Sequence, residues 1–132
     1  MKGDAAIIRD QTNTQDMRWD DDRGRLSFRR FIDGDETPSE ALTFGIATLR
    51  SDEFLAPHRH SHPEIYYILE GAAELTVGGQ IHSVAGGCGI FIPGNAEHAI
   101  RNTSDVTCRF LYAFAADRFS EITYVFSPKA IP

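Results

Sequence analysis

A histidine-rich stretch near the middle of the chain carries the residue types most able to do chemistry. His58, His60, Glu64 and Tyr66 are separated by even numbers of residues. Successive side chains of an extended strand point to opposite faces, so residues of one parity share a face. Imidazole nitrogens and a carboxylate that converge on one point bind a divalent transition metal. The alternative is a histidine cluster in a surface loop, but the hydrophobic run after Glu64 favours an ordered strand and a metal site.

A second segment could supply another ligand. A strand pattern runs into Pro93-Gly94-Asn95, residue types that form tight turns, and the chain then returns through His98. This return can place His98 opposite the first histidine pair. Taken alone, His98 would more often be a turn or surface residue.

The rest of the chain is typical of a small all-β domain. Short alternating segments end at Gly, Pro, Asn or Asp, and helical periodicity is almost absent, which predicts an antiparallel sandwich or barrel. The predicted strands are 25–31, 42–49, 64–69, 73–77, 80–84, 88–92, 98–102, 107–114 and 119–126. We expect an N-terminal arm over residues 1–24, with one short strand near 6–9, and a barrel over residues 25–132. One helical turn is expected near 116–120.

Two spaced patterns in this chain resemble the motifs of the cupin family, which are small conical double-stranded β-barrels of the jelly-roll type. The first motif, G(x)5HxH(x)3–4E(x)6G, is matched by His58, His60, Glu64 and Gly71, with Asp52 at its leading glycine. The second motif, G(x)5PxG(x)2H(x)3N, is matched by Gly87, Pro93, His98 and Asn102, with Asn95 at its second glycine. Asn tolerates the left-handed backbone better than other non-glycine residues, so the departure at Asn95 is a mild one.

The cupin resemblance implies one divalent transition metal and names its ligands. These ligands are His58, His60, Glu64 and His98. Fe2+ is the favoured ion, and Mn2+, Ni2+ or Zn2+ suit the same donors. His62 lacks the motif spacing and is expected behind the ligands or at the rim, whereas His82 is expected on the surface.

The stretches from His58 to Tyr66 and from Phe91 to His98 also resemble the small cupin lyases that cleave dimethylsulfoniopropionate. The resemblance implies that the substrate carboxylate binds the metal and that a tyrosine removes the α-carbon proton. Dimethyl sulfide then leaves from the β-carbon, and acrylate remains. Tyr66 is the expected base, and Tyr124 is a second candidate or a substrate-positioning group. Tyr66 or Phe91 would attract the sulfonium cation through the face of its ring.

Two other functions fit the same motifs because one fold hosts many activities. They are an Fe(II)-dependent cupin dioxygenase and a non-catalytic cupin that binds a small molecule.

Charge and composition narrow the expected partners. The net charge of −6 argues against binding to nucleic acid or to an anionic membrane. We therefore expect a small-molecule substrate with a carboxylate, and a homodimer by analogy with other cupins. No apolar run approaches the ~20 residues of a membrane span, and the N-terminus does not resemble a secretory signal. Both features predict a cytoplasmic protein, in which Cys88 and Cys108 are free thiols.

Overall fold

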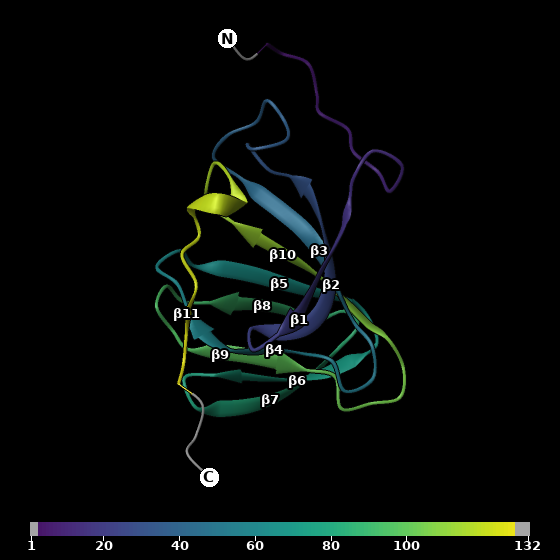
Figure 1. The fold of residues 1–132 in the computed structure, drawn as a ribbon, viewed down its shortest axis with the longest axis vertical. Helices are drawn as coiled ribbons and strands as arrows, with labels where there is room; N and C mark the ends of the chain where they lie inside the picture. The colour runs from purple at the N-terminus through teal and green to yellow at the C-terminus, as the bar shows by residue number, and fades with distance from the viewer. Residues whose placement is uncertain (1–2, 129–132) are drawn as a thin grey trace.

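A computed structural model describes residues 3–128 as a curled antiparallel β-sheet (Figure 1). Its strands are β1 (Asp16–Asp21), β2 (Gly24–Ile32), β3 (Thr43–Leu49), β4 (Phe54–Arg59), β5 (Glu64–Glu70), β6 (Ala72–Val77), β7 (Gln80–Ala85), β8 (Gly89–Ile92), β9 (His98–Arg101), β10 (Cys108–Phe114) and β11 (Val125–Phe126). One 3-10 turn, η1 (Phe119–Glu121), precedes β11. The all-β cupin-type barrel predicted from the sequence is confirmed.

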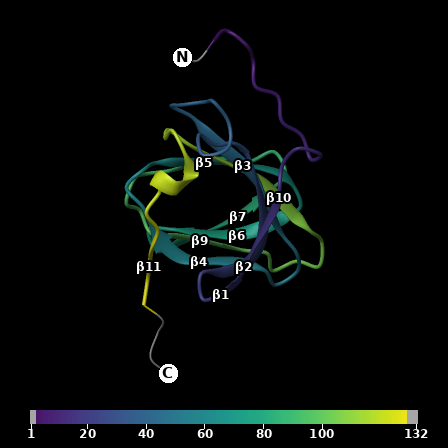
Figure 2. The ribbon, with the colours of Figure 1, turned by 45° about the horizontal axis from the view of Figure 1, so that its top comes forward.

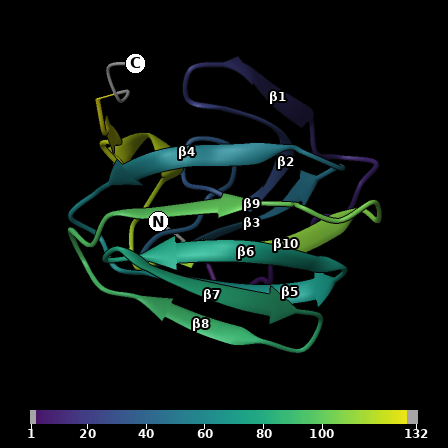
Figure 3. The same ribbon diagram turned by 90° about the horizontal axis from the view of Figure 1, so that it is seen from below.

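The sheet curls so that its two halves face each other across the core. The strand order is β7-β6-β9-β4-β2-β3-β10-β5-β8, while β1 pairs with β2 and β11 pairs with β4. Figure 2 shows the strands arranged around a central space, and Figure 3 shows β7, β6, β9 and β4 in front of β3, β10 and β5. Residues of one parity on each strand therefore point into a common interior.

Most strands lie where the alternating pattern predicts them, but the sequence reading misses several elements. The strands β1 and β4 were not expected as such, and the strand predicted near residues 6–9 is wrong because this segment has no regular structure. Only residues 125–126 of the predicted strand 119–126 pair with another strand, since η1 occupies its beginning. The expected helical turn corresponds to η1. The arm therefore contributes β1, which pairs with β2 along its whole length.

Both departures from the cupin motifs fall at backbone positions that favour glycine. Asp52 and Asn95 each have φ of 65°, in the left-handed region that Asp and Asn enter more readily than other side-chain-bearing residues. The motif glycine Gly71 has φ of 80°, and a Cβ there would lie 2.3 Å from the carbonyl oxygen of Thr107. The substitutions at 52 and 95 thus preserve the turns that the motif glycines form.

Alternation of apolar side chains builds the core. In β10, Phe110 and Phe114 are buried together with Cys108 and Tyr112, while the intervening residues are only partly buried. Further fully buried side chains come from both halves of the sheet: Leu49, Ile68, Leu75, Ile92 and Ile100. Burying residues of this size contributes roughly 1.5–3 kcal/mol each. No helix in residues 3–128 has the length and apolar character needed to span a membrane.

Asn102, the last residue of the second motif, ties the loop after β9 to the core. Its side chain is fully buried, its Nδ2 donates to the carbonyl oxygens of Leu49 (2.9 Å) and Val106 (2.7 Å), and its Oδ1 accepts from the amide of Ser104 (2.9 Å). An alanine at this position would leave two carbonyls and one amide without their partner.

We predict that Asn102→Ala lowers the free energy of unfolding by about 3 kcal/mol, because buried polar groups without partners are costly. Urea denaturation followed by circular dichroism measures the change. The control is Thr103→Ala, whose side chain is exposed and whose effect should stay within about 0.5 kcal/mol. Equal stability of the two variants would contradict this role of Asn102.

Candidate metal centre and active site

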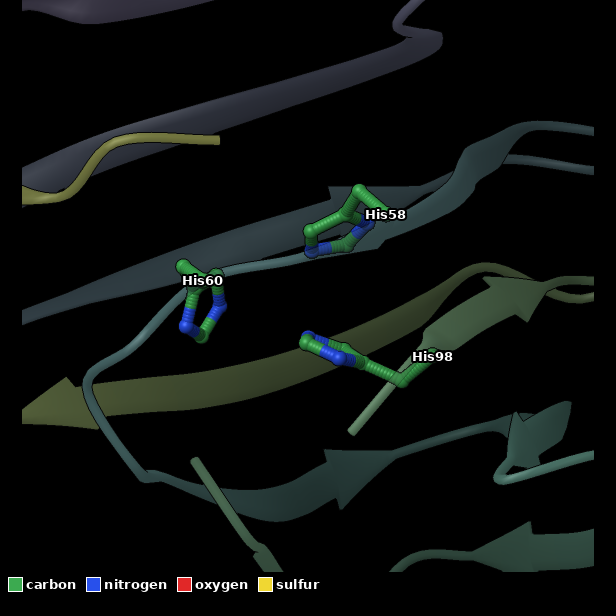
Figure 4. A group of neighbouring side chains, drawn as sticks. All are labelled: His58, His60 and His98. Carbon is green, nitrogen blue, oxygen red and sulfur yellow. The ribbon is translucent and has the colours of Figure 1, made fainter. Parts of the chain in front are cut away.

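Three histidines from two adjacent strands and the following turn meet in the interior. His58 lies on β4 opposite His98 on β9, and His60 follows directly after β4. Their ring centroids are 4.1 Å (His58–His98), 5.0 Å (His60–His98) and 5.5 Å (His58–His60) apart. One ring nitrogen from each lies within 4.8 Å of the other two, and Figure 4 shows the three rings turned toward a common centre. The three side chains could therefore hold a metal ion.

Backbone carbonyls orient all three rings in the same way. Nδ1 lies 2.7 Å from the carbonyl oxygen of Ala56 in His58, 2.8 Å from that of His62 in His60, and 2.9 Å from that of Ala96 in His98. An Nδ1 that donates to a carbonyl leaves Nε2 as the unprotonated nitrogen. Each ring thus directs its Nε2 into the interior, and this nitrogen can bind a metal when it is unprotonated.

Glu64 reaches the same centre from the opposite half of the sheet. Its Oε1 lies 3.3 Å from Nε2 of His60 and 3.3 Å from Nε2 of His98, and only 3% of the residue is exposed. Nε2 of His58 is buried without a hydrogen-bond partner, whereas Nε2 of His98 is within hydrogen-bond distance of the Glu64 carboxylate. A buried carboxylate next to imidazole nitrogens needs positive charge nearby, which a protonated histidine or a bound cation supplies. This donor set fits a divalent transition metal.

The prediction that His58, His60, Glu64 and Tyr66 share one face of a single strand is wrong. These residues come from different elements, because β4 ends at Arg59 and β5 begins at Glu64. Since β4 and β5 lie in opposite halves of the sheet, the connection through residues 60–63 carries the chain across the barrel. The residues of the first motif thus come from both halves of the sheet. The rule that residues of one parity share a face applies only within a single strand.

Burial sets the charge state of the histidines. It lowers the pKa of His58 to about 3, and the neighbouring His98 lowers it further. Burial also lowers the pKa of His60, but the hydrogen bond and negative charge of Glu64 outweigh this effect and raise it overall. His58 is therefore neutral across the physiological range, as a metal ligand must be.

Both predicted catalytic tyrosines lie beside the histidines. Tyr66 on β5 is buried, with its ring centroid 6.3 Å from that of His98. Tyr124 is stacked on His58 at 5.0 Å and contacts His60 edge-on at 5.3 Å. Burial, followed by the charge of Glu64, raises the pKa of both phenols well above the usual value. Without added positive charge, both tyrosines are neutral.

The C-terminal segment holds Tyr124 in place. β11 pairs with β4 through Phe126 opposite His58, and the amide of Ser127 donates to the carbonyl oxygen of Pro57 at 2.9 Å. The Ser127 hydroxyl also donates to the carboxylate of Glu97. A two-residue strand would be marginal alone, so these bonds and the ring contacts with Phe126 and Trp19 stabilise the position of Tyr124.

A cavity next to the histidines has mainly aromatic walls. It is lined by Trp19, Leu26, Phe28, Ala47, Leu55, Glu64, Tyr66, Phe110, Tyr112, Phe119 and Tyr124. Its empty volume is about 350 Å3, including open solvent at its mouth. Glu64 and Tyr66 thus lie beside the candidate metal centre and also form part of the wall of this cavity.

Sequence reasoning missed part of this wall. Tyr112 was not singled out, although it alternates with Phe110 and Phe114 along one predicted strand, a pattern that places all three inside. Trp19 of the predicted arm was considered either as a cap on a pocket or as an anchor of the arm; in the structure it contacts Tyr124 and lines the cavity. The proposed role of Phe91 in attracting a cation is wrong, because Phe91 is 64% exposed and does not line the cavity.

The remaining predicted residues are placed as follows. His62 is half-buried and is not part of the histidine group; its contribution is the carbonyl oxygen next to Nδ1 of His60. His82 is exposed on β7, as expected. Cys88 and Cys108 are free thiols, as expected, and burial raises the pKa of Cys108 to about 11. The Cys108 thiol is therefore protonated near neutral pH and is not a reactive thiolate.

A model of the cupin domain matches residues 45–114, which span more than half of the chain and contain both motifs. The chain belongs to the cupin family. This cupin is 36% identical to the dimethylsulfoniopropionate lyase DddW of Ruegeria pomeroyi over 81% of its own length and 70% of that protein. It is also 33% identical to protein SchB of Streptomyces halstedii, over 52% of its own length and 50% of SchB.

Solved structures share the fold of this cupin. The polyketide cyclase RemF of Streptomyces resistomycificus superposes with a TM-score of 0.79 at 20% identity, covering 96% of this chain and 88% of RemF. A predicted oxalate decarboxylase of Thermotoga maritima superposes with a TM-score of 0.73 at 20% identity, covering 83% and 99% of the two chains. At this level of identity, the likeness concerns the barrel and not the reaction.

We predict that His58→Ala and His98→Ala each lose bound metal. Loss of a group that only orients a ligand costs about 10- to 100-fold in metal affinity, so loss of a ligand should cost more. Equilibrium dialysis against Mn2+ or Zn2+, followed by elemental analysis, measures the stoichiometry. The control is His82→Ala, which removes an exposed histidine. Full metal retention by His58→Ala or His98→Ala would show that the removed side chain is not a ligand.

Proposed function

We propose that this cupin is a metal-dependent lyase that cleaves dimethylsulfoniopropionate to dimethyl sulfide and acrylate. The observation that carries the proposal is the shared wall of the site, in which Glu64 and Tyr66 line an aromatic cavity next to His58, His60 and His98. The candidate metal ligands, a tyrosine and a cavity whose aromatic rings can attract a cation thus lie next to one another. The similarity to DddW over most of the chain supports the same reaction.

The lining of the cavity suits the cationic end of this substrate. Apart from Glu64, the described residues that line it are aromatic or aliphatic, and they include Trp19, Phe28, Phe119 and Tyr124. The faces of such rings attract a sulfonium cation, and this attraction strengthens when water is excluded. The apolar walls also favour departure of dimethyl sulfide, because this leaving group is neutral.

The proposed ligands are His58, His60, Glu64 and His98, with Fe2+ favoured and Mn2+, Ni2+ or Zn2+ as alternatives. When bound, the divalent cation would hold the substrate carboxylate, increase the acidity of the adjacent C–H bond and favour ionised tyrosine. Residues of this chain would carry out the proton transfer and position the substrate.

The proposed reaction is a β-elimination. Tyr66, as phenolate, accepts the proton from the α-carbon, and the electrons of that C–H bond form the C=C bond of acrylate. The bond between the β-carbon and sulfur breaks with its electron pair on sulfur, which releases neutral dimethyl sulfide. Tyr124 lies over His58 and is the second candidate for the base, or a group that positions the substrate. Oriented groups in a dry site can lower the barrier by several kcal/mol.

We predict that metal-loaded protein releases dimethyl sulfide and acrylate in equal amounts from dimethylsulfoniopropionate under anaerobic conditions. Headspace gas chromatography and liquid chromatography measure the two products. Chelation should abolish both, and re-addition of metal should restore them. Absence of product with Fe2+, Mn2+, Ni2+ and Zn2+ would contradict the lyase, and oxygen uptake would then be measured for the dioxygenase alternative.

We predict that Tyr66→Phe retains metal but lowers kcat by about 10²- to 10⁴-fold, the usual range for loss of a general base. Tyr67→Phe is the matched control, because Tyr67 is the next residue of β5 and is 44% exposed. If Tyr124→Phe is inactive while Tyr66→Phe turns over normally, Tyr124 is the base.

The homodimer and the cytoplasmic location stay predictions. For a homodimer, a candidate contact surface is the outer face of β5 and β8, which carries the exposed apolar side chains Ile65, Leu69 and Phe91.

A further inference from the structure

Tyr112 carries a buried polar atom that no described residue satisfies. The residue is only 6% exposed, and its hydroxyl has no hydrogen-bond partner. Leaving such a group without a partner costs about 1–3 kcal/mol. A phenylalanine would fill the same space without this cost, so the hydroxyl calls for an explanation.

The backbone around Tyr112 makes specific room for this hydroxyl. Tyr112 pairs with Gly45 on β3, and a Cβ at Gly45 would lie 2.3 Å from the Tyr112 hydroxyl oxygen. The ring therefore lies across the glycine, and any larger residue at position 45 would displace the phenol. Glycine weakens a strand interior, so its presence in β3 often marks a close approach of this kind.

Tyr112 belongs to the same cavity as the proposed reaction. It lines the cavity together with Glu64 and Tyr66, and on β10 it is the direct cross-strand partner of Tyr66 on β5. Cross-strand partners have Cβ atoms roughly 4.5–5.5 Å apart. Burial and the charge of Glu64 raise the pKa of Tyr112, so its hydroxyl stays protonated and can donate a hydrogen bond.

A carboxylate that enters this cavity needs neutral donors. Among the described residues that line it there is no Arg, Lys or His. A metal at the histidines would satisfy one carboxylate oxygen, which leaves the second oxygen to a phenol hydroxyl or to the indole N–H of Trp19. Tyr66 and Tyr124 already have proposed roles in proton transfer or positioning, whereas Tyr112 has none.

We propose that the Tyr112 hydroxyl donates a hydrogen bond to the carboxylate of the bound substrate. The proposal rests on the proposed function for the identity of the substrate, but it requires only that the site binds a small carboxylate. Tyr112 then acts as a substrate-binding residue that holds the carboxylate at its hydroxyl, which lies over Gly45 of β3. Gly45 is the residue that allows the phenol to lie there.

A competing explanation is a water-mediated contact within the protein. Oδ2 of Asp33, fully buried, also has no hydrogen-bond partner, and the charge of Asp33 acts on Tyr112. Asp33, however, is ion-paired with Arg30 at 3.5 Å, so its carboxylate has a partner already. A structural bridge to Asp33 predicts a loss of stability on removal of the hydroxyl, and a ligand-binding role does not.

The test compares Tyr112→Phe with the wild type and with Tyr67→Phe as control. Propanoate, which has no leaving group, is titrated into the Zn2+-loaded proteins by isothermal titration calorimetry. We expect Tyr112→Phe to bind propanoate about 10- to 100-fold more weakly, the usual cost of losing a hydrogen bond to a charged group. The thermal midpoint of the metal-free variant should be unchanged or slightly higher, because no internal bond is lost.

Three results would overturn the proposal. They are equal propanoate affinity in Tyr112→Phe and wild type, a lowered thermal midpoint with unchanged affinity, and no propanoate binding by the wild type. The result of the propanoate titration does not depend on whether the protein cleaves dimethylsulfoniopropionate. If the wild type binds propanoate but does not cleave dimethylsulfoniopropionate, the proposed function fails and the role of Tyr112 is still decided by the variant.

Discussion

Convergence of buried nitrogen and oxygen donors on one point is the constraint on which this site depends. His58, His60 and His98 direct their Nε2 atoms at one another, and Glu64 adds a carboxylate oxygen 3.3 Å from two of them. The rings cannot turn away without breaking the hydrogen bonds between Nδ1 and backbone carbonyls. The barrel thus holds these donor atoms in place, and a bound cation would contact all of them at once.

The strands that hold the ligands also determine what surrounds them. β4 and β9 supply His58 and His98 as cross-strand partners, while β5 approaches from the other half of the sheet with Glu64 and Tyr66. Apart from Glu64, the side chains that line the cavity between these halves are aromatic or aliphatic. A low-dielectric wall strengthens each electrostatic interaction inside it. The same packing therefore stabilises the barrel and strengthens the electrostatic interactions within the site.

The two ends of the described chain complete the cavity. Trp19 of β1 and Tyr124, which precedes β11, contact each other with ring centroids 5.7 Å apart. Neither residue lies within residues 45–114, which the cupin model matches. The matched segment provides the ligands, and segments outside it provide part of the wall. Differences in such flanking segments are a physical reason why cupins with one ligand set can act on different substrates.

The sequence alone determined the barrel class and the ligand candidates, because both depend on local patterns. Alternation of apolar residues marks the strands, and the spacing of His58, His60, Glu64 and His98 matches motifs that extend over few residues. The roles of Asp52 and Asn95 were also readable in part, since Asn tolerates the left-handed backbone that the turn requires. The fold and the grouping of the three histidines agree with this reading.

Only the tertiary structure decided which residues form the cavity. Trp19, Tyr112 and Tyr124 are far apart in the sequence and meet because the sheet curls and its ends fold back over it. Parity places a side chain on a face of its strand, but it does not say which strands become neighbours. Phe91 shows the limit of local reasoning: it lies in a motif, yet β8 presents it to the outside.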